Sequence, residues 1–416
     1  MAGVLSAQMA RYLVFTQDLS SVLQHLDRIG SEHRDSDTVV LSSLLASSIA
    51  RALGGRPRAA LEEVAQAEEI LQRIPDAFPT AATQLGVTKG LALLLRGDAH
   101  AALAAVQAPY ARAAESEVAH DALGSLAAML GHVLLLSGRP RHARSVLEEA
   151  VEELVVRDQL GLLPLSLAGL AEAASLVDDP DTCDRALDRL SQLPERLQRY
   201  YGSFVERSRG LALHYRGDIA EGTESVRAAA RRARIAGRHA ASVLALLDMA
   251  RVGEIAEAHE ALEGVAAQGE EPWLVEHARV FASGARDGKH EVLASVGRQF
   301  AERGFELIGA EALARAACAA EGAGARSAAF TYTVACDRLV GDCEVETAVT
   351  RARPEVLTER EREIADRVAA GRSNSEIAAE LVLSARTIES HLGRIYKRLD
   401  IDGREALSAL TAVNGP

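Results

Sequence analysis

The sequence predicts an all-α protein in which a stack of helical hairpins is followed by a compact domain of four short helices. The chain has 416 residues, more than one domain usually holds. Hydrophobic residues make up 48% of it and aromatic residues only 4%. Alanine, leucine, arginine and glutamate, which are strong helix formers, recur throughout, and no long run of alternating Val, Ile and Thr competes with them.

The charge distribution limits where an anionic partner could bind. The net charge of the whole chain is −13, so the molecule as a whole does not attract nucleic acid. The C-terminal segment 355–416 holds 9 Lys+Arg and 11 Asp+Glu, a net charge of −2. Any basic surface must therefore be confined to one face of one element.

Cysteine usage and hydropathy indicate a cytoplasmic protein. The four cysteines, Cys183, Cys318, Cys336 and Cys343, show no CxxC spacing, and we expect buried thiols in a reducing compartment. The N-terminus lacks the basic flank and apolar block of a signal peptide. No apolar run reaches the ~18 residues that a membrane span needs. We expect no membrane contact and a location in the cytoplasm, at the nucleoid.

Small turn motifs recur along the first three quarters of the chain. Examples are "RGDAHAALAAV" at 96 and "SGRPRHARSVLEEA" at 137. Taking the last Gly or the turn Asp as a marker gives positions 55, 97, 138, 179, 217 and 253. A helix, a turn and a second helix of this length form an αα-hairpin, which buries its apolar face only by stacking on others. The pattern predicts an α-solenoid over residues 1–340.

This predicted solenoid is similar in architecture to tetratricopeptide arrays. Its period is longer than the usual ~34 residues, and the Trp, Tyr and Pro signature positions of such arrays are mostly absent. Solenoids present a concave surface that commonly binds a protein, a peptide or a small ligand. We therefore expect a sensing or interaction domain with an unknown effector or protein partner. A role as spacer or oligomerisation platform remains the alternative.

Motifs for catalysis or cofactor binding are absent from the sequence. The nearest approach to the phosphate-binding pattern GxxxxGK[ST] is "GARDGKH" at 284–290, one residue too short and with His290 where Ser or Thr belongs. No HExxH or GxSxG occurs, and the twelve histidines form no metal-ligand spacing. We expect no enzyme, no cofactor and no metal.

The helical pattern breaks in "VTRARPEV", where Arg353 precedes a proline and is pushed away from helical angles. We take residues 341–356 as a linker and 357–416 as the C-terminal domain. There Thr358 is the expected N-cap of a first helix, with Glu361 completing a capping box, and Gly371 is the expected stop.

Three more helices follow at short intervals in the C-terminal domain. A second is expected at about 374–381, a third from a Ser384 cap to about 399, and a fourth at about 403–413. In the third, Ile388, Leu392, Ile395 and Leu399 fall on one face. The helix has a local charge of +3, from Arg386, Arg394, Lys397 and Arg398 against Glu389. A short helix, a tight turn and a helix with one apolar and one basic face predict a helix-turn-helix, which places its second helix in the DNA major groove.

The run "LTEREREIADRVAAGRSNSEIAAELVLSARTIESHLGRIYKRLDIDGREAL" at 357–407 closely resembles the LuxR-type, or GerE-type, helix-turn-helix domain. The matching pieces include LTxRExEI, AxGxSNxEIAxxL and LSARTIESHLGRIYKRL. With its solenoid, the chain also resembles the C-terminal part of the large ATP-binding LuxR regulators. It lacks their nucleotide-binding domain, so ATP control is not implied. A phosphoacceptor receiver and an acyl-homoserine-lactone pocket are absent as well, which leaves sensing to the helical repeat.

The resemblance implies roles for individual residues of the domain. The positions that touch bases in this family fall on Glu389, Ser390 and Gly393. Phosphate contacts fall on Thr387, Arg394, Lys397 and Arg398. Asn374 and Ser384 are expected to cap the two helices and to meet the DNA backbone. Arg386 is expected either to contact phosphate or to pair with a neighbouring acid such as Glu389 or Glu380, and His391 to be a packed helix residue.

The fourth helix, "REALSALTAV", resembles the dimerisation helix of the family. Leu407 and Leu410 would lie at the dimer contact, with packing inside the domain as the alternative. We expect a sequence-specific transcriptional regulator that binds promoter DNA as a homodimer and meets RNA polymerase. Activation is the expected output, although the sequence leaves repression open. The competing hypothesis is a helical-repeat adaptor whose C-terminal domain has little DNA affinity.

Overall fold

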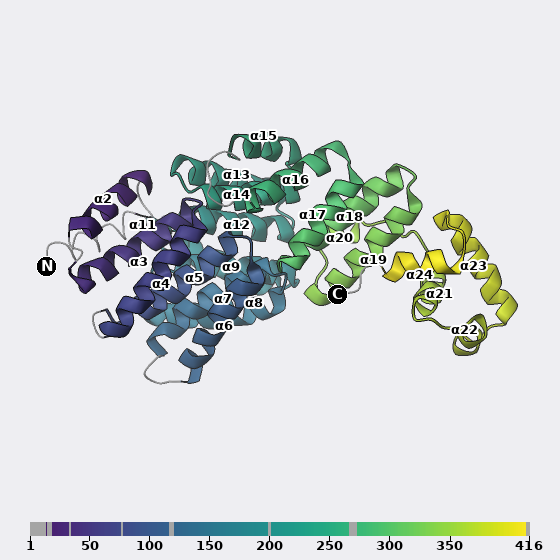
Figure 1. Cartoon of the computed structure of the whole chain (residues 1–416), viewed down its shortest axis with the longest axis horizontal. Coiled ribbons are helices and arrows are strands. Elements are labelled where there is room, and N and C mark those ends of the chain that lie inside the picture. Colours follow the sequence, from purple (N-terminus) through teal and green to yellow (C-terminus); the bar gives the residue numbers. More distant parts are fainter. Residues whose placement is uncertain are drawn as a thin grey trace. The chain divides into compact units, whose positions relative to one another are not determined.

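The computed structural model describes residues 14, 19–32, 35–75, 78–115, 120–198, 201–265 and 273–412. Within these ranges the chain forms helices and no strands, which confirms the all-α prediction (Figure 1). Two compact units are present, Met1–Ser283 with Arg303–Phe305, and Gly284–Glu302 with Glu306–Pro416. The N-terminal residues 1–13, for which we expect no signal peptide, lie outside the described part.

The helices of the first unit follow one another with short connections, and the boundary between the units falls inside the last of them. In order they are α2 (Leu19–Glu32), α3 (Asp37–Leu53), α4 (Pro57–Arg73), α5 (Ala81–Leu95), α6 (Ala99–Glu115), the 3-10 turn η1 (His120–Ala122), α7 (Leu123–Leu136), α8 (Pro140–Val156), α9 (Leu163–Leu176), α10 (Pro180–Gln192), α11 (Glu195–Gln198), α12 (Gly202–Arg216), α13 (Ile219–Ile235), α14 (His239–Arg251), α15 (Ile255–Val265) and α16 (Trp273–Asp287).

The second unit contains three helices that continue the hairpin pattern, one short helix after them, and the four helices of the C-terminal domain. They are α17 (His290–Glu302), α18 (Glu306–Gly322), α19 (Arg326–Cys343), α20 (Ala348–Arg351), α21 (Glu359–Ala369), α22 (Asn374–Glu380), α23 (Ala385–Leu399) and α24 (Arg404–Ala412).

The predicted turn positions are the points where the backbone reverses between paired helices. Gly55, Gly97, Gly138, Gly217 and Gly253 all have positive φ, between 75° and 112°. Glycine adopts this left-handed conformation at little steric cost. The fourth turn differs from the prediction by one residue, because Asp178 takes the left-handed conformation and Asp179 instead caps α10 by accepting from the Thr182 amide.

Small side chains lie at a fixed distance from these turns, at the place where the two helices of a hairpin cross. At eight of the left-handed turns the residue seven positions before the left-handed residue and the residue five positions after it are both small and buried. The pairs are Ser48 and Ala60, Gly90 and Ala102, Gly131 and Ala143, Ala171 and Cys183, Gly210 and Gly222, Ala230 and Ser242, Gly297 and Gly309, and Ala317 and Ala329. Small residues let the helix backbones approach closely, so this spacing marks where the two helices at each of these turns cross.

Alternate helices of the first unit differ in how much of their surface is buried. In α14, 12 of 13 residues are buried, whereas α13 buries only 7 of 17, along one face. A helix that is apolar all round belongs in the interior of a protein, and an amphipathic helix belongs at its surface. The hairpins therefore stack with one helix inside and one outside, as in α12 with α13 and α7 with α8 (Figure 1).

A buried ionic network joins three of the interior helices. Asp248 of α14 accepts from Arg207 Nε of α12 at 2.5 Å and from Arg251 Nη1 at 2.6 Å. The Arg207 guanidinium also lies 3.8 Å from the Glu172 carboxylate of α9. All four side chains are at most 6% exposed. Each charge has an opposite charge beside it, which a buried ion requires.

We expect His132 of α7 to make the stability of the first unit depend on pH. Its Nε2 donates to the Leu165 carbonyl at 3.1 Å, and burial lowers the pKa of the ring to about 4. The unfolded chain therefore binds the proton first, near the ordinary pKa of about 6.5. The stabilisation is complete above that pH and is lost as pH falls towards the folded-state value.

We expect acidification from pH 7 to pH 5 to cost the wild-type protein about 2 kcal/mol more than it costs the His132→Gln variant. Glutamine keeps a donor for Leu165 but does not titrate. Urea unfolding of both proteins at the two pH values measures this difference. Equal losses of stability in the two proteins would contradict the role of His132.

The predicted linker 341–356 contains the last residues of α19 and the short helix α20, which Thr347 caps with Thr350. Arg353 within it pairs with Asp337 of α19 at 2.5 Å and with Glu346 at 2.9 Å. Asp337 also lies 3.5 Å from Arg362 of α21. Charged contacts within the second unit thus connect α19 to the first helix of the C-terminal domain.

The expectation of four buried thiols is wrong for one cysteine. Cys183, Cys336 and Cys343 are buried, but Cys318 is exposed on α18. Its thiol donates to the Ala352 carbonyl at 3.3 Å. The scattered positions of the cysteines contain no information on which face of a helix each thiol occupies.

Candidate nucleic-acid interface

Three side-chain caps fix where the helices of the C-terminal domain begin. Thr358 and Glu361 form the predicted capping box of α21, with the Thr358 amide donating to Glu361 at 3.0 Å. Ser384 caps α23, as predicted, by accepting from the Thr387 amide at 3.1 Å. Each cap satisfies amides that have no partner inside their helix. The chain therefore enters each helix at a defined angle.

The cap of α22 differs from the prediction. Ser373 is the N-cap and forms a capping box with Glu376, whose carboxylate accepts from the Ser373 amide at 2.7 Å. Asn374, the predicted cap, is the first helical residue, and its side-chain oxygen accepts from Arg404 at 2.9 Å. Asn374 thus connects α22 to α24.

The turn between α22 and α23 is held from α21. Arg360 donates from Nη2 to the Leu381 carbonyl at 3.0 Å, and Arg367 pairs with Glu380 at 2.9 Å. Val382, within this turn, has a φ of 56° and is 90% exposed. A β-branched residue rarely adopts this conformation. The arginine contacts of α21 hold the turn in place around it.

The two faces of α23 match the sequence prediction. Ile388, Leu392, Ile395 and Leu399 are buried at 0–4% exposure. They pack in the domain core together with Ile364 of α21 and Ile377 of α22, which are also fully buried. The other face of α23 is exposed, and its residues are Arg386, Glu389, Ser390, Gly393, Arg394, Lys397 and Arg398. The base-reading and most phosphate-contact candidates therefore share one surface.

The exposed candidates differ in how firmly they are held. Arg398 lies 3.5 Å from the buried Glu361 carboxylate, and Arg394 donates to the Ser390 hydroxyl at 3.3 Å. Within the described residues, Arg386 and Lys397 make no ion pair. The alternative acid for Arg386, Glu380, instead contacts Arg367 and Arg372.

Thr387 and His391 are half-buried. The Thr387 hydroxyl is 2.7 Å from that of Ser384, so it already serves the cap. Glu389, like Arg386, makes no ion pair among the described residues, and its carboxylate is exposed. The two side chains are therefore not paired with each other on the helix surface.

Gly393 has no packing role inside the domain. A Cβ built on it would have nothing within 4 Å, and glycine in a helix interior is about 1 kcal/mol less favourable than alanine. The residue lies in the middle of the exposed face of α23. The lack of a side chain leaves the backbone of α23 open to close approach by another molecule.

The predicted dimerisation leucines lie in different environments. Leu407 is fully buried within the chain, where α24 packs against α21 and also against α19, which agrees with the intramolecular alternative for this residue. Leu410 is half-buried. Thr411, next to it, is 8% exposed and donates to the Leu407 carbonyl at 3.1 Å. Any contact through α24 must therefore rely on Leu410 and its exposed neighbours.

Several residues that position this surface escape detection in the sequence. Arg360 holds the turn, Arg367 pairs α21 with α22, and Arg404 reaches Asn374. These contacts join residues 13 to 30 positions apart, so no helical spacing indicates them. In the described residues, no group of His, Cys, Asp or Glu is arranged to hold a metal ion.

Comparison with known proteins identifies the C-terminal domain. The family described as bacterial regulatory proteins, luxR family, matches residues 355–410. The "Probable transcriptional regulatory protein NarL" of Mycobacterium tuberculosis is 43% identical over 54 residues, 13% of this chain and 25% of that protein. The "Transcriptional regulatory protein UhpA" of Salmonella typhimurium is 40% identical over 63 residues, 15% of this chain and 31% of that protein.

Residues 355–410 are thus a luxR-family, or GerE-type, helix-turn-helix domain of the kind that binds DNA. The chain matches between a quarter and a third of the length of these two regulators. None of the helices in the described ranges combines the length and apolarity needed to cross a bilayer.

The helical repeat is similar in fold to a solved structure, the "Crystal Structure of Rap Protein Complexed with Competence and Sporulation Factor". The TM-score is 0.58, and the match covers 82% of this chain and 99% of that one at 12% identity. At this identity the likeness shows the fold alone. It supports the prediction of a tetratricopeptide-like helical repeat.

Proposed function

We propose that the protein is a sequence-specific transcriptional regulator, an activator, that inserts α23 into the major groove of promoter DNA. The observation that carries the proposal is the exposed face of α23, with Arg386 and Lys397 outside any ion pair of the described residues. Free cations on a rigid, capped helix suit phosphate contacts. The match of this segment to a DNA-binding domain supports the same conclusion.

The repeat is the part that receives a ligand or protein signal in this proposal. Solenoid repeats supply extended binding surfaces, and a protein of similar fold is named in complex with a "Competence and Sporulation Factor". RNA polymerase is the proposed partner of the DNA-bound form. Residues 357–416 are the proposed DNA-binding module, and 1–340 the proposed sensing module.

A salt titration of promoter-DNA binding by the full-length protein tests the regulator function. Each phosphate contact contributes about −0.9 to the slope of log K against log salt. The matched variants are Lys397→Ala on α23 and Arg189→Ala on α10, both of which remove one exposed cation. If the slope of log K against log salt is shallow and is the same in both variants, the result would support the adaptor hypothesis instead.

Glu389 is expected to act in specificity. Its exposed carboxylate can accept from the N4 amino group of a cytosine, a contact that discriminates between bases by ~1–3 kcal/mol, and it also repels phosphates. Glu389→Gln should therefore keep or raise affinity for random DNA and relax the preference at one operator position. Lys397→Ala should weaken binding to all DNA sequences alike, and it should reduce the slope of log K against log salt by about one.

Binding-site selection with wild type and both variants distinguishes these effects. The control is Lys397→Ala, because it changes the charge on the same helix without removing the proposed base contact. An unchanged preference at every operator position in Glu389→Gln would mean that this carboxylate does not read a base.

Gly393→Ala should have opposite effects on stability and on DNA binding. An added methyl meets no atom of the domain, so the helix should gain up to about 1 kcal/mol. If the DNA backbone or bases approach α23 here, the same methyl should weaken binding. Urea unfolding and titration of promoter DNA measure the two effects. A more stable variant with unchanged DNA affinity would show that this surface remains clear of DNA.

We place two copies of the protein on one operator. Two copies of α23 can enter successive major grooves on one side of the duplex when the half-sites are about one helical turn apart. Leu410 on α24 remains the candidate contact, because Leu407 is fully buried within its own chain. Footprinting of the bound operator would show two protected half-sites at this spacing, or one if a single copy binds.

A further inference from the structure

The first unit closes on itself between its early and its late hairpins. Trp273, at the start of α16, lies against Gly97 in the turn between α5 and α6. A Cβ on Gly97 would come within 3.0 Å of three atoms of the Trp273 indole, so a larger residue at this turn leaves no room for the ring. The indole also stacks on His277, with 4.1 Å between the ring centroids, and on Phe305, with 6.2 Å.

The backbone takes part in the same contact. The Ala99 amide, in the first turn of α6, donates to the Arg303 carbonyl at 2.9 Å, and the Arg303 guanidinium lies 5.3 Å from the centre of the Trp273 ring. Gly304 lies against His100, because a Cβ on this glycine would be 3.0 Å from His100 Nδ1. We call these segments, which are residues 97–100, Trp273 and residues 303–305, the closure contact.

The inner helices are buried on the side that an open solenoid would expose. In α7, 12 of 14 residues are buried, nearly as many as in α14, although stacking on neighbouring hairpins covers only the flanks and the outer side of such a helix. α14 also contacts α3, from the beginning of the unit. Gly55 and Pro57, in the turn after α3 and at the start of α4, share a small cavity of about 20 Å³ with Leu274 of α16. The concave surface expected from the sequence is therefore covered by the chain itself.

Little space remains at this inner surface. A cavity of about 60 Å³ lies there, lined mainly by apolar side chains of α3, α5, α7, α12 and α14, with His132 and Arg207 among the few polar ones. Pockets that hold small molecules have volumes of ~300–1,000 Å³. A molecule of that size can reach the inner surface only when the unit opens.

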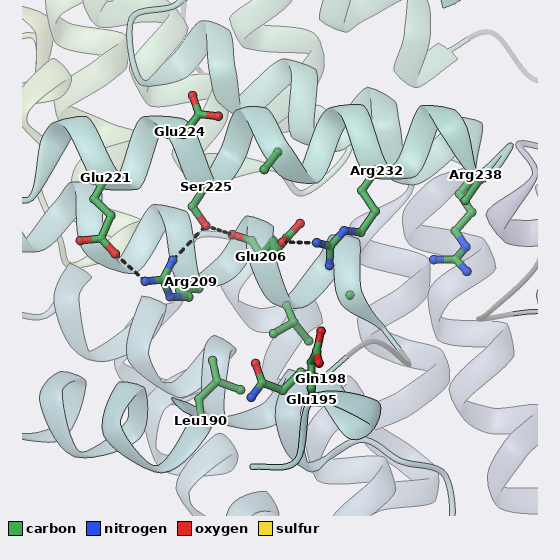
Figure 2. Close-up of a pocket in the computed structure, with 14 residues that line it drawn as sticks. Leu190, Glu195, Gln198, Glu206, Arg209, Glu221, Glu224, Ser225, Arg232 and Arg238 are labelled. Atoms are coloured by element: carbon green, nitrogen blue, oxygen red, sulfur yellow. Dashed lines mark hydrogen bonds and ion pairs between the residues drawn. The ribbon is translucent and has the colours of Figure 1, made fainter. Parts of the chain in front are cut away.

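A larger groove, of about 860 Å³, lies on the other face of α12, between α10 and α13 (Figure 2). It shares no lining residue with the inner cavity. Arg209 in it pairs with Glu221 at 2.5 Å, and Arg232 pairs with Glu206 at 2.8 Å. These charged pairs hold α12 to α13, and the groove gives no access to the inner cavity through its own lining.

The closure contact is the place where the unit can open with the smallest loss of packing. Successive hairpins pack along the length of their helices, whereas the closure contact consists of two turns and one indole ring. Regions with few buried contacts open before the rest of a structure does. Separation at this contact leaves every hairpin and every helix crossing intact.

We propose that the closure contact is a latch, and that the first unit opens between Gly97 and Trp273 to expose its inner surface to the signal. This inference rests on the proposed sensing role of the repeat. The open form is a minor state, because opening brings the apolar lining of the inner cavity into water. A molecule that binds the exposed surface shifts the unit towards the open form by its preference for that form.

The test measures how fast a thiol on the inner surface is alkylated in the full-length protein. Leu244 of α14 lines the inner cavity and is 4% exposed, so Leu244→Cys places the thiol there. The thiol reacts only while the unit is open, and its alkylation rate therefore follows the population of the open form. Mass spectrometry of peptides after treatment with iodoacetamide gives the rate at each cysteine separately.

Two native cysteines are internal standards. Cys318 is exposed and should react fast in every variant. Cys183 is fully buried inside its own hairpin, with the Ser175 hydroxyl 3.1 Å from its sulfur, so it should remain slow when the unit opens without unfolding. Faster alkylation at position 244 with an unchanged rate at Cys183 identifies opening.

Gly97→Ala, in the Leu244→Cys protein, should force the latch open. The added Cβ overlaps the indole, so the ring must leave, and alkylation at position 244 should become roughly ten-fold faster. Trp273 is the only tryptophan of the chain, so tryptophan emission should move to longer wavelength in this variant. Gly217→Ala is the matched control and should change neither signal. Gly217 also has a left-handed φ, 109°, but nothing lies within 4 Å of a Cβ built on it.

Gly304→Ala tests the other side of the closure contact. Its Cβ would lie 3.0 Å from His100 Nδ1 and 3.1 Å from the His100 amide nitrogen, so alkylation at position 244 should again become faster. Gly324→Ala is the control for this variant, because Gly324 has a similar φ of 76° and nothing within 4 Å of a Cβ built there. This second pair keeps the latch testable if Gly97→Ala does not fold.

Three results would overturn the latch. In the first, position 244 reacts as fast as Cys318 in the protein with all its glycines, which would mean that the inner surface is not closed. In the second, Gly97→Ala and Gly304→Ala leave the rate at position 244 unchanged. In the third, Cys183 becomes faster together with position 244, which would mean that helices unfold instead of separating.

Promoter-DNA binding by the same preparations separates this inference from the regulator function. Normal DNA binding with no effect of the two glycine variants on alkylation would remove the latch and leave the regulator. The expected alkylation rates in a protein that does not bind DNA would remove the regulator function and leave the latch.

Discussion

Replacing Asp248 with alanine should destabilise the first unit by about 3–5 kcal/mol, because the change leaves two buried guanidinium groups without their shared carboxylate. Arg207 Nε and Arg251 Nη1 both donate to Asp248, which is 1% exposed. The remaining acid, Glu172, is 3.8 Å from Arg207 and cannot replace two short hydrogen bonds. Urea unfolding followed by circular dichroism measures the effect.

Two controls show whether the loss comes from the buried charge. Asp248→Asn keeps the size of the side chain and one acceptor, so it should cost less than alanine. Asp184→Ala removes a carboxylate that is 57% exposed and paired with Arg216, and should cost at most about 1 kcal/mol. Similar losses for Asp248→Ala and Asp184→Ala would show that the buried network contributes little to stability.

Gly222→Ala should destabilise the protein by about 3 kcal/mol. The added Cβ would lie 2.6 Å from the Gly210 carbonyl oxygen and 2.6 Å from the His214 amide nitrogen. Both are backbone atoms, so no side chain can rotate away, and α12 and α13 must separate. Overpacking of this kind typically costs ~1–3 kcal/mol, and the backbone position of both atoms sets the expectation at the upper end.

Gly264→Ala is the matched control for this prediction. Gly264 is also helical, on α15, but nothing lies within 4 Å of a Cβ built there. The same substitution should leave stability unchanged or raise it by up to ~1 kcal/mol, since alanine favours helix. The two variants should therefore change the urea midpoint in opposite directions. A loss of stability in both would mean that the cause is not the crossing of α12 and α13.

Local patterns in the sequence predict much of the C-terminal domain. A capping box spans three residues, so Thr358 and Glu361 can be paired from spacing alone, and the apolar face of α23 follows from the helical period. The cap of α22 is predicted one residue late, because Ser373 and Asn374 are both common cap residues. Only the backbone angles, with ψ of 161° at Ser373, decide between them.

Features that depend on distant residues could not be predicted. One groove of the first unit is lined by Leu190 of α10 together with Arg238, which follows α13. The buried ionic network brings Glu172 of α9 close to Asp248 of α14. Nothing in a linear pattern indicates that these helices meet, because their proximity depends on the stacking of successive hairpins. The left-handed turns at Gly304 and Gly324 also lie outside the predicted turn positions, the last of which is Gly253.

The fixed placement of small residues around each left-handed turn has a consequence for engineering the repeat. Because eight of the turns use the same offsets, with a small residue seven positions before the turn and another five positions after it, the segment from one small residue to the next is a module with its own register. A deletion or duplication that keeps these segments whole preserves their helix crossings. One that cuts within such a segment places a large side chain against a backbone, as Gly222 illustrates. Chimaeras of this protein should therefore be joined between hairpins, where the chain leaves one outer helix and enters the next inner helix.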